Sequence, residues 1–312
     1  MEKTEISVVI PACNEEESVI LLYNELKKNL DKLNKSYELI FIDDGSKDNT
    51  FKQLKIIKVK DDRLKIIKFR KNFGQTAALD AGFRLAKGNI IISLDSDLQD
   101  NPDEIPRFLN KINEGFDVVC GWRIKRNDSL SKKLFSRIAN LVRFVILGRG
   151  VNDSGCTFRA YRNYAIKDIN LFGEMHRYIP YLLIWKGFKI SEIKVIHRAR
   201  KFGKSKYGIK RLIKGFLDML VVKFWMQYSI RPVHLFGALG LLITFLGFII
   251  GFYLLVMKFF YAQSIANRPL LLLSVLLIIL GIQFLIFGLL FDILIKDYYK
   301  DKRYYNVEAI IE

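Results

Sequence analysis

Short apolar runs rich in β-branched residues alternate with longer stretches in which apolar positions recur every three or four residues. The short runs are residues 6–10, 37–42, 64–69, 90–94 and 117–121, and the first longer stretches are residues 19–30, 48–58 and 75–86. Such alternation of strand and helix predicts an α/β domain with a mostly parallel sheet and helices on both faces. Ligands of such sheets bind beyond the carboxyl ends of the strands, where we expect the turns at Pro11, Asp43 and Asp95 to line one pocket.

Two later stretches contain no charged residue. Residues 233–257 and 269–291 lack Asp, Glu, Lys and Arg, and each exceeds the roughly 20 residues that cross a bilayer as a helix. We therefore expect two transmembrane helices. Only Lys258 and Arg268 lie between them, whereas basic residues flank both outer ends, so the positive-inside rule places both chain ends, including the tail 292–312, in the cytosol.

Two basic amphipathic stretches lie between the α/β domain and the spans. Residues 131–147 read SKKLFSRIANLVRFVIL, with Lys133, Arg137 and Arg143 on one helical stripe. This pattern suits a helix that lies in the membrane interface, and it equally suits a surface helix packed on a core. Residues 209–230 form a second, juxtamembrane stretch. The predicted organisation is a cytosolic domain over residues 1–210, followed by this helix and the two spans.

The composition supports a membrane protein. The chain of 312 residues is 51% hydrophobic and carries a formal net charge of +18, a combination that fits an anionic membrane surface better than nucleic acid, for which no motif is present. Cys13, Cys120 and Cys156 are far apart and odd in number, so neither a disulfide framework nor a zinc site is indicated. We expect no signal peptide at the start.

The most informative acidic segment is residues 93–104, SLDSDLQDNPDE, directly after a predicted buried strand. Asp95 and Asp97 can turn toward one point, and Gln99 offers a neutral oxygen, which together predict a site for Mg²⁺ or Mn²⁺. A calcium loop would need Gly and Glu where this chain has Asp100 and Pro106.

A helix start explains the second half of that segment. Asp100 or Asn101 can cap a helix whose first residue is Pro102, but such a cap leaves Asp95 and Asp97 without a role. The chain has neither a dinucleotide-binding GxGxxG motif nor a P-loop, so bound phosphates need another counter-charge. A metal at the acidic segment can supply that charge.

Four segments carry a family resemblance: VVIPACNEE, FIDDGSKDNT, RKNFGQTAALDAGFRLAKGN and LDSDLQDNP. In this order and spacing they resemble the family 2 glycosyltransferases of GT-A fold, most closely the polyisoprenyl-phosphate glycosyltransferases, which include dolichol-phosphate mannose synthases and undecaprenyl-phosphate sugar transferases. The resemblance covers about the first 210 residues and continues into the membrane part. The chain departs from the usual pattern at Cys13, where the family has an aromatic residue, and at Ser96, where it has Ala.

The resemblance implies roles for the donor side of the site. It assigns the nucleoside to Pro11, Glu15 and Asp43 or Asp44, the metal and diphosphate to Asp95, Asp97 and Gln99, and further diphosphate contacts to Arg200 and Lys206. For Asp43 and Asp44 the alternative is a turn ahead of Gly45. For Arg200 and Lys206 it is a juxtamembrane segment that meets only lipid headgroups.

The resemblance also implies roles for residues that bind the acceptor. Arg123 and Arg137 match positions at which the family binds the phosphate of a lipid acceptor, and Asp153 matches the candidate general base. A phosphomonoester is already largely ionised at neutral pH, so Asp153 could instead orient a substrate, or simply form a turn before Gly155. His176 recurs in the family within HRYIP, and His197 is expected to be structural.

The resemblance therefore predicts an inverting, metal-dependent hexosyltransferase. It would move one sugar from a nucleotide-diphosphate sugar, UDP-glucose first and GDP-mannose second, to undecaprenyl or dolichyl phosphate at the cytosolic membrane face. Processive polysaccharide synthases of this fold carry a QxxRW motif, which is absent here. A non-catalytic nucleotide-sugar sensor and a membrane translocase remain the alternatives of another class, and homo-oligomerisation stays open.

Overall fold

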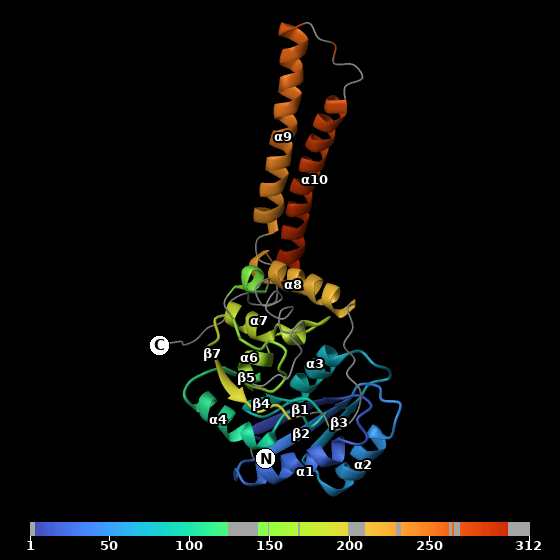
Figure 1. Cartoon of the computed structure of the whole chain (residues 1–312), viewed down its shortest axis with the longest axis vertical. Coiled ribbons are helices and arrows are strands. Elements are labelled where there is room, and N and C mark those ends of the chain that lie inside the picture. Colours follow the sequence, from blue (N-terminus) through green and yellow to red (C-terminus); the bar gives the residue numbers. More distant parts are fainter. Residues whose placement is uncertain are drawn as a thin grey trace. The chain divides into compact units, whose positions relative to one another are not determined.

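A computed structural model of the chain (Figure 1) describes residues 4–123, 143–148, 150–167, 169–198, 210–228, 232–261, 264 and 269–298. Side chains are not described for residues 210–216, 296 and 298. Residue contacts divide the chain into two compact units, Met1–Val222 and Lys223–Glu312.

The first unit is built on a sheet of seven strands. These are β1 (Ile6–Ala12), β2 (Tyr37–Asp43), β3 (Leu64–Lys68), β4 (Ile90–Ser93), β5 (Val118–Arg123), β6 (Arg159–Arg162) and β7 (Ile190–Val195), in the order β3-β2-β1-β4-β6-β5-β7. Among the described strands β6 alone runs antiparallel, to both β4 and β5. The mostly parallel sheet predicted from the sequence is confirmed.

Helices cover both faces of this sheet, as the hydrophobic pattern predicts. They are α1 (Val19–Asp31), α2 (Thr50–Lys60), α3 (Gln75–Leu85), α4 (Ile105–Asn113), α6 (Asn163–Lys167) and α7 (Ile179–Trp185), with short 3-10 turns η1 (Pro102–Glu104) and η2 (Met175–Arg177). Val8 and Phe41 face the core under α1 and α4, whereas Val9 and Ile42 meet α3 on the other face. Figure 1 shows α3 on the side of the strands away from α1 and α2.

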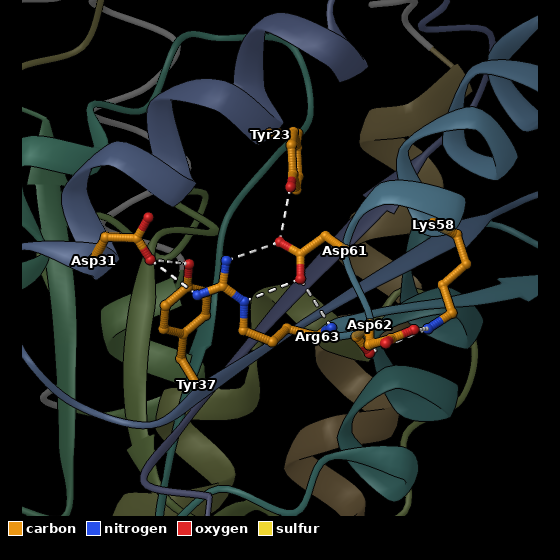
Figure 2. A network of polar contacts seen from close by, with 7 residues as sticks. All are labelled: Tyr23, Asp31, Tyr37, Lys58, Asp61, Asp62 and Arg63. Atoms are coloured by element: carbon orange, nitrogen blue, oxygen red, sulfur yellow. Dashed lines mark hydrogen bonds and ion pairs between the residues drawn. The ribbon is translucent and has the colours of Figure 1, made fainter.

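The amino ends of β2 and β3 are joined by a polar network around Arg63 (Figure 2). Arg63 donates from Nε and Nη2 to the two oxygens of Asp61, each at 3.0 Å, and from Nη1 to Asp31 at 2.9 Å. Its guanidinium lies 4.5 Å from the Tyr37 ring centroid, and the Tyr23 hydroxyl donates to Asp61 at 2.8 Å. These contacts tie the ends of α1 and α2 to the edge of the sheet opposite the candidate site.

The second unit contains the two apolar helices α9 (Pro232–Phe260) and α10 (Pro269–Tyr298), preceded by α8 (Lys210–Tyr228), which crosses the unit boundary. Their apolar parts, Pro232–Phe260 and Pro269–Ile295, are long and apolar enough to span a membrane, in agreement with the prediction. Small residues let the helices approach: Ser274 Oγ donates to the Gly247 carbonyl at 2.8 Å, and a Cβ on Gly281 would lie 2.1 Å from Thr244 Oγ1.

The Arg63 network generates a prediction about stability. Burial alone would raise the pKa of Asp61, but hydrogen bonds from Arg63 and Tyr23 outweigh it and lower that pKa from 3.8 to about 2. A depressed pKa means that the carboxylate stabilises the fold fully above about pH 4 and loses this effect as pH falls toward 2. Asp61→Asn should therefore lower the stability of the full chain by about 1–3 kcal/mol, equally at every pH from 5 to 8.

Thermal unfolding of the detergent-solubilised chain at several pH values measures this effect. Asp62→Asn is the matched control, because its side chain is fully exposed and approaches Lys58 only at 3.5 Å. If the difference in melting temperature between wild type and Asp61→Asn changed between pH 5 and 8, the lowered pKa of Asp61 would be wrong.

Candidate functional site

The predicted turns gather at the carboxyl edge of the sheet. β1 and β2 are paired in register from Ile6 with Tyr37 to Ala12 with Asp43, and β4 lies on the other side of β1. The loops that follow these three strands therefore emerge side by side. Pro11 itself is buried within β1, opposite Ile42.

The loop after β1 is locked to the loop after β2. Asn14 has a positive φ of 56°, and its N–H donates to Ser46 Oγ at 3.0 Å. The N–H of Glu15 donates to Thr50 Oγ1 at 2.9 Å, while the Glu15 carboxylate accepts from Ser18 Oγ at 2.7 Å. Glu15 therefore lies at this edge, where its N–H contacts the first residue of α2 and its carboxylate holds the residue before α1.

Asp43 and Asp44 are both buried but have different partners. Asp44 accepts from the N–H groups of Phe73 at 2.7 Å and Gly74 at 2.9 Å, which precede α3. Asp43 Oδ1 accepts from the Ser46 N–H at 3.0 Å. Asp43 Oδ2 is buried and has no hydrogen-bond partner among the residues that the structure describes. Asp44 thus fixes the loop before α3, whereas one buried oxygen of Asp43 lacks a hydrogen-bond partner among the described residues.

The acidic loop after β4 carries three carboxylates, each held by a hydrogen bond. Asp95 Oδ1 accepts from Gln75 Nε2 at 2.6 Å, Asp97 Oδ1 accepts from the Gln99 N–H at 3.1 Å, and Asp100 Oδ2 accepts from the Asp95 N–H at 3.3 Å. Burial, together with the charges of Asp100 and Asp97, raises the pKa of Asp95 to about 7. Close carboxylates that repel one another in this way favour a bound cation.

The donor set fits a divalent cation that substrate oxygens would complete. Within the described ranges no three side chains of His, Cys, Asp or Glu are arranged as a ready metal cluster. Asp95 and Asp97 would supply two hard oxygen ligands, the number that Mg²⁺ sites often take from protein when a diphosphate fills the remaining positions. The cap predicted for this segment also forms, because Asn101 Oδ1 accepts from the Asp103 N–H at 3.2 Å ahead of Pro102.

The segment after β7 is fastened to the acidic loop. Arg198 donates its N–H to the Gln99 carbonyl at 2.9 Å, and its own carbonyl accepts from Gln99 Nε2 at 3.2 Å. Its guanidinium reaches Glu25 at 2.7 Å and Asn101 at 2.6 Å. His197, expected to be structural, pairs with Asp100 through a β-bridge. Sequence reasoning missed Arg198, whose only signal was its position just before the basic segment RKFGKSKY.

A second loop, residues 151–157, holds an ion pair between two predicted site residues. Arg123 donates from Nε and Nη2 to the two oxygens of Asp153, at 2.6 and 2.9 Å, and both side chains are 11% exposed. The Gly155 N–H also donates to Asp153 Oδ1, at 3.1 Å. Burial by itself would lower the pKa of Arg123, but the hydrogen bonds to Asp153 raise it. Arg123 therefore keeps its positive charge beside this carboxylate.

Two further arginines hold the same loop. Arg159 is 2% exposed and donates to the carbonyl of Ser154 at 2.7 Å and to that of His176 at 2.9 Å. Arg143 donates from Nη1 to Ser154 Oγ. His176 is anchored in turn, because its Nδ1 lies 2.7 Å from Thr76 Oγ1 on α3. The basic stripe in the sequence included Arg143, but no local pattern indicated Arg159.

Some predicted site residues lie outside the described residues. These are Arg137, Arg200, Lys206 and most of the amphipathic stretch 131–147, of which residues 143–147 are described and helical.

Comparisons with known proteins agree on one family. The model of the family described as Glycosyl transferase family 2 matches residues 7–170. The chain is 38% identical over 306 residues to a dodecaprenyl-phosphate galacturonate synthase of Rhizobium johnstonii, covering 96% of this chain and 90% of the relative. It is 36% identical over 287 residues to an undecaprenyl-phosphate 4-deoxy-4-formamido-L-arabinose transferase of Proteus mirabilis, covering 91% and 86%.

Solved structures show the same fold. A glucosyl-3-phosphoglycerate synthase of Mycobacterium tuberculosis, in complex with Mn²⁺, UDP and phosphoglyceric acid, superimposes with a TM-score of 0.55 at 18% identity, over 70% of this chain and 78% of that one. The same enzyme has been solved with Mg²⁺ and UDP, with a TM-score of 0.53 at 18% identity, over 70% and 79%. These likenesses establish the α/β fold of the first unit.

The junction of the loops generates a prediction at Gly45. Its φ is +66°, and a Cβ would lie 2.4 to 2.8 Å from backbone atoms of Lys71 and Asn72. Gly115 has a φ of +99° and nothing within 4 Å of such a Cβ, so it is a matched control for backbone strain alone. We expect Gly115→Ala to destabilise the chain by roughly 1–2 kcal/mol and Gly45→Ala by at least twice that amount.

Melting temperatures of the two variants measure the difference. Equal losses for Gly45→Ala and Gly115→Ala would show that the close approach of residues 44–46 to residues 71–73 does not constrain the site.

Proposed function

Because the chain belongs to glycosyltransferase family 2, we propose that this enzyme transfers one sugar from a nucleotide-diphosphate sugar to a polyprenyl phosphate, with inversion at the sugar. The observation that carries the proposal is the match over more than nine tenths of the chain to two relatives named for transfer to a polyprenyl phosphate. The two apolar helices suit such an acceptor, whose phosphate lies at a membrane surface.

The donor is proposed to be a UDP-sugar. The sequence alone suggested UDP-glucose, but the two relatives are named for galacturonate and for 4-deoxy-4-formamido-L-arabinose. We therefore place UDP-galacturonate and UDP-4-deoxy-4-formamido-L-arabinose ahead of UDP-glucose, with GDP-mannose last.

Asp43 is the better candidate for the nucleoside than Asp44. A uracil ring presents an imide N–H, and the buried Oδ2 of Asp43 can accept it. Both oxygens of Asp44 already accept backbone N–H groups, so Asp44 acts by holding the neighbouring loop. Pro11 and Glu15 shape the same edge from β1 and the loop after it.

The leaving diphosphate is proposed to lie over the acidic loop. Asp95 and Asp97 would hold Mg²⁺ or Mn²⁺, with Gln99 beside them, and the cation would supply charge to stabilise the departing diphosphate. Gln75 orients Asp95 through the 2.6 Å hydrogen bond. Arg198 holds Gln99 and Asn101 from the other side of the loop. Arg200 and Lys206 remain proposed contacts of the diphosphate.

The acceptor phosphate is proposed to meet the arginine side of the site. Arg123, together with Arg137, would bind it, since guanidinium groups meet phosphate oxygens two at a time. A phosphate monoester already carries between one and two negative charges at neutral pH and needs little help from a base. Catalysis then rests on positioning the acceptor oxygen opposite the leaving group, with opposite charges arranged on the two sides.

The membrane topology follows from the charge pattern. We propose that both chain ends and the α/β domain lie in the cytosol, because basic residues flank the outer ends of both spans. Nucleotide sugars would reach the site from the cytosol and the lipid from the bilayer.

The test is transfer of radiolabel from each of the four donors into an organic-extractable lipid, using purified full-length protein, Mn²⁺ and undecaprenyl phosphate. We expect label from one UDP-sugar, sensitive to chelator, and a loss of roughly 100-fold or more in Asp97→Asn. Asp103→Asn is the matched control, because this exposed acid lies in the turn η1 directly after the same loop and should leave turnover unchanged. Folded protein that binds UDP yet labels no lipid from any donor would refute the proposal.

A further inference from the structure

The carboxylate of Asp153 accepts hydrogen bonds from an arginine side chain and a loop N–H, groups that commonly bind phosphate in proteins. Two nitrogens of the Arg123 guanidinium donate to its two oxygens, and the Gly155 N–H donates to one of them. Planar guanidinium groups and loop N–H groups are the usual protein ligands of phosphate esters. The pair is 11% exposed on each side, so the two charges are largely withdrawn from water.

A hydroxyl group and a second arginine lie next to this carboxylate. Ser154, the next residue, receives a hydrogen bond from Arg143 on its hydroxyl oxygen. The Ser154 carbonyl accepts from Arg159, whose two terminal nitrogens donate to the carbonyls of Ser154 and His176 and so fix the loop in place. Residues 153–155 therefore present a hydroxyl and an N–H in fixed positions between two arginines, Arg123 and Arg143.

We propose that residues 153–155 with Arg123 and Arg143 form a phosphate-monoester seat in which Asp153 is the resident anion, and that the acceptor phosphate binds by exchanging with Asp153 on Arg123. This inference rests on the proposed function and adds Arg143 and Ser154 to the acceptor side. It also assigns Asp153 a positioning role: it holds Arg123 until the acceptor arrives.

Exchange of Asp153 for the acceptor phosphate is favourable because Arg123, which is largely buried, is never left without a partner of opposite charge. Breaking a buried Arg–Asp pair by removing one partner is strongly destabilising, since the remaining charge is uncompensated. A phosphate monoester that enters as Asp153 leaves keeps Arg123 paired throughout and brings a larger negative charge than the carboxylate. The fit is close at Gly155, where a Cβ would lie 3.2 Å from Arg123 Nη2.

The test measures phosphate binding without any donor. The probe is farnesyl phosphate, a soluble short prenyl phosphate, titrated by calorimetry into the detergent-solubilised full chain, with farnesol and inorganic phosphate separating the contributions of chain and phosphate. We expect Asp153→Asn to bind farnesyl phosphate roughly tenfold more tightly, because the competing charge is gone while the shape is kept. Arg143→Gln should bind it roughly tenfold more weakly.

Asp61→Asn is the matched control. It removes the charge of another two-pronged Arg–Asp pair, with Arg63 (Figure 2), at the opposite end of the sheet, and should leave farnesyl phosphate binding unchanged. Unchanged or weaker binding by folded Asp153→Asn would overturn the exchange. Unchanged binding by Arg143→Gln would overturn the seat, and this variant decides the matter alone if Asp153→Asn does not fold.

Steady-state kinetics separates this role from general-base catalysis. Exchange predicts that Asp153→Asn lowers the KM for the lipid phosphate, whereas loss of a base would lower kcat and leave KM unchanged. Because the binding arm contains no donor, absence of sugar transfer by wild type would count against the proposed function and would leave the seat standing.

Discussion

The proposed donor side of the site depends on the two hydrogen bonds that Asp44 accepts from the N–H groups of Phe73 and Gly74. They fix the start of α3, and the first residue of α3, Gln75, donates to Asp95. The carboxylate at the end of β2 thereby determines where the acidic loop after β4 can lie. This relay works only because β1, β2 and β4 are parallel and in register, which places their loops on one edge.

Acidic and basic side chains gather on different loops at the carboxyl edge of the sheet. Asp95, Asp97 and Asp100 lie on the loop after β4, and Arg123, Arg143 and Arg159 surround the loop before β6. Thr157 connects the two, since its carbonyl accepts from Ser93 Oγ at 2.6 Å and its hydroxyl accepts from Gln75 Nε2 at 3.3 Å. A cation with a diphosphate suits the first side and a phosphate monoester suits the second, as the proposed reaction requires.

The sequence by itself determined the fold class and the two apolar helices. Alternating β-branched runs and helical periodicity are local signals, and they were sufficient because each element buries one continuous apolar face. A span without charged residues is equally local, and the helices found at 232–260 and 269–298 contain the predicted ranges. The acidic segment was visible for the same reason, because Asp95, Asp97 and the cap at Asn101 are neighbours along the chain.

Only the tertiary structure decided how distant residues share their partners. The sequence did not distinguish the roles of Asp43 and Asp44. The structure does, because N–H groups 29 and 30 residues away donate to both oxygens of Asp44. It assigned Arg123 and Asp153 to different tasks, although they bind each other across 30 residues. Arg159 gave no local signal, Arg198 was marked only by its position before a basic segment, and nothing local indicated the antiparallel direction of β6. Hydrogen bonds and strand pairing between distant segments depend on the packed fold, whereas periodicity reports only on neighbours.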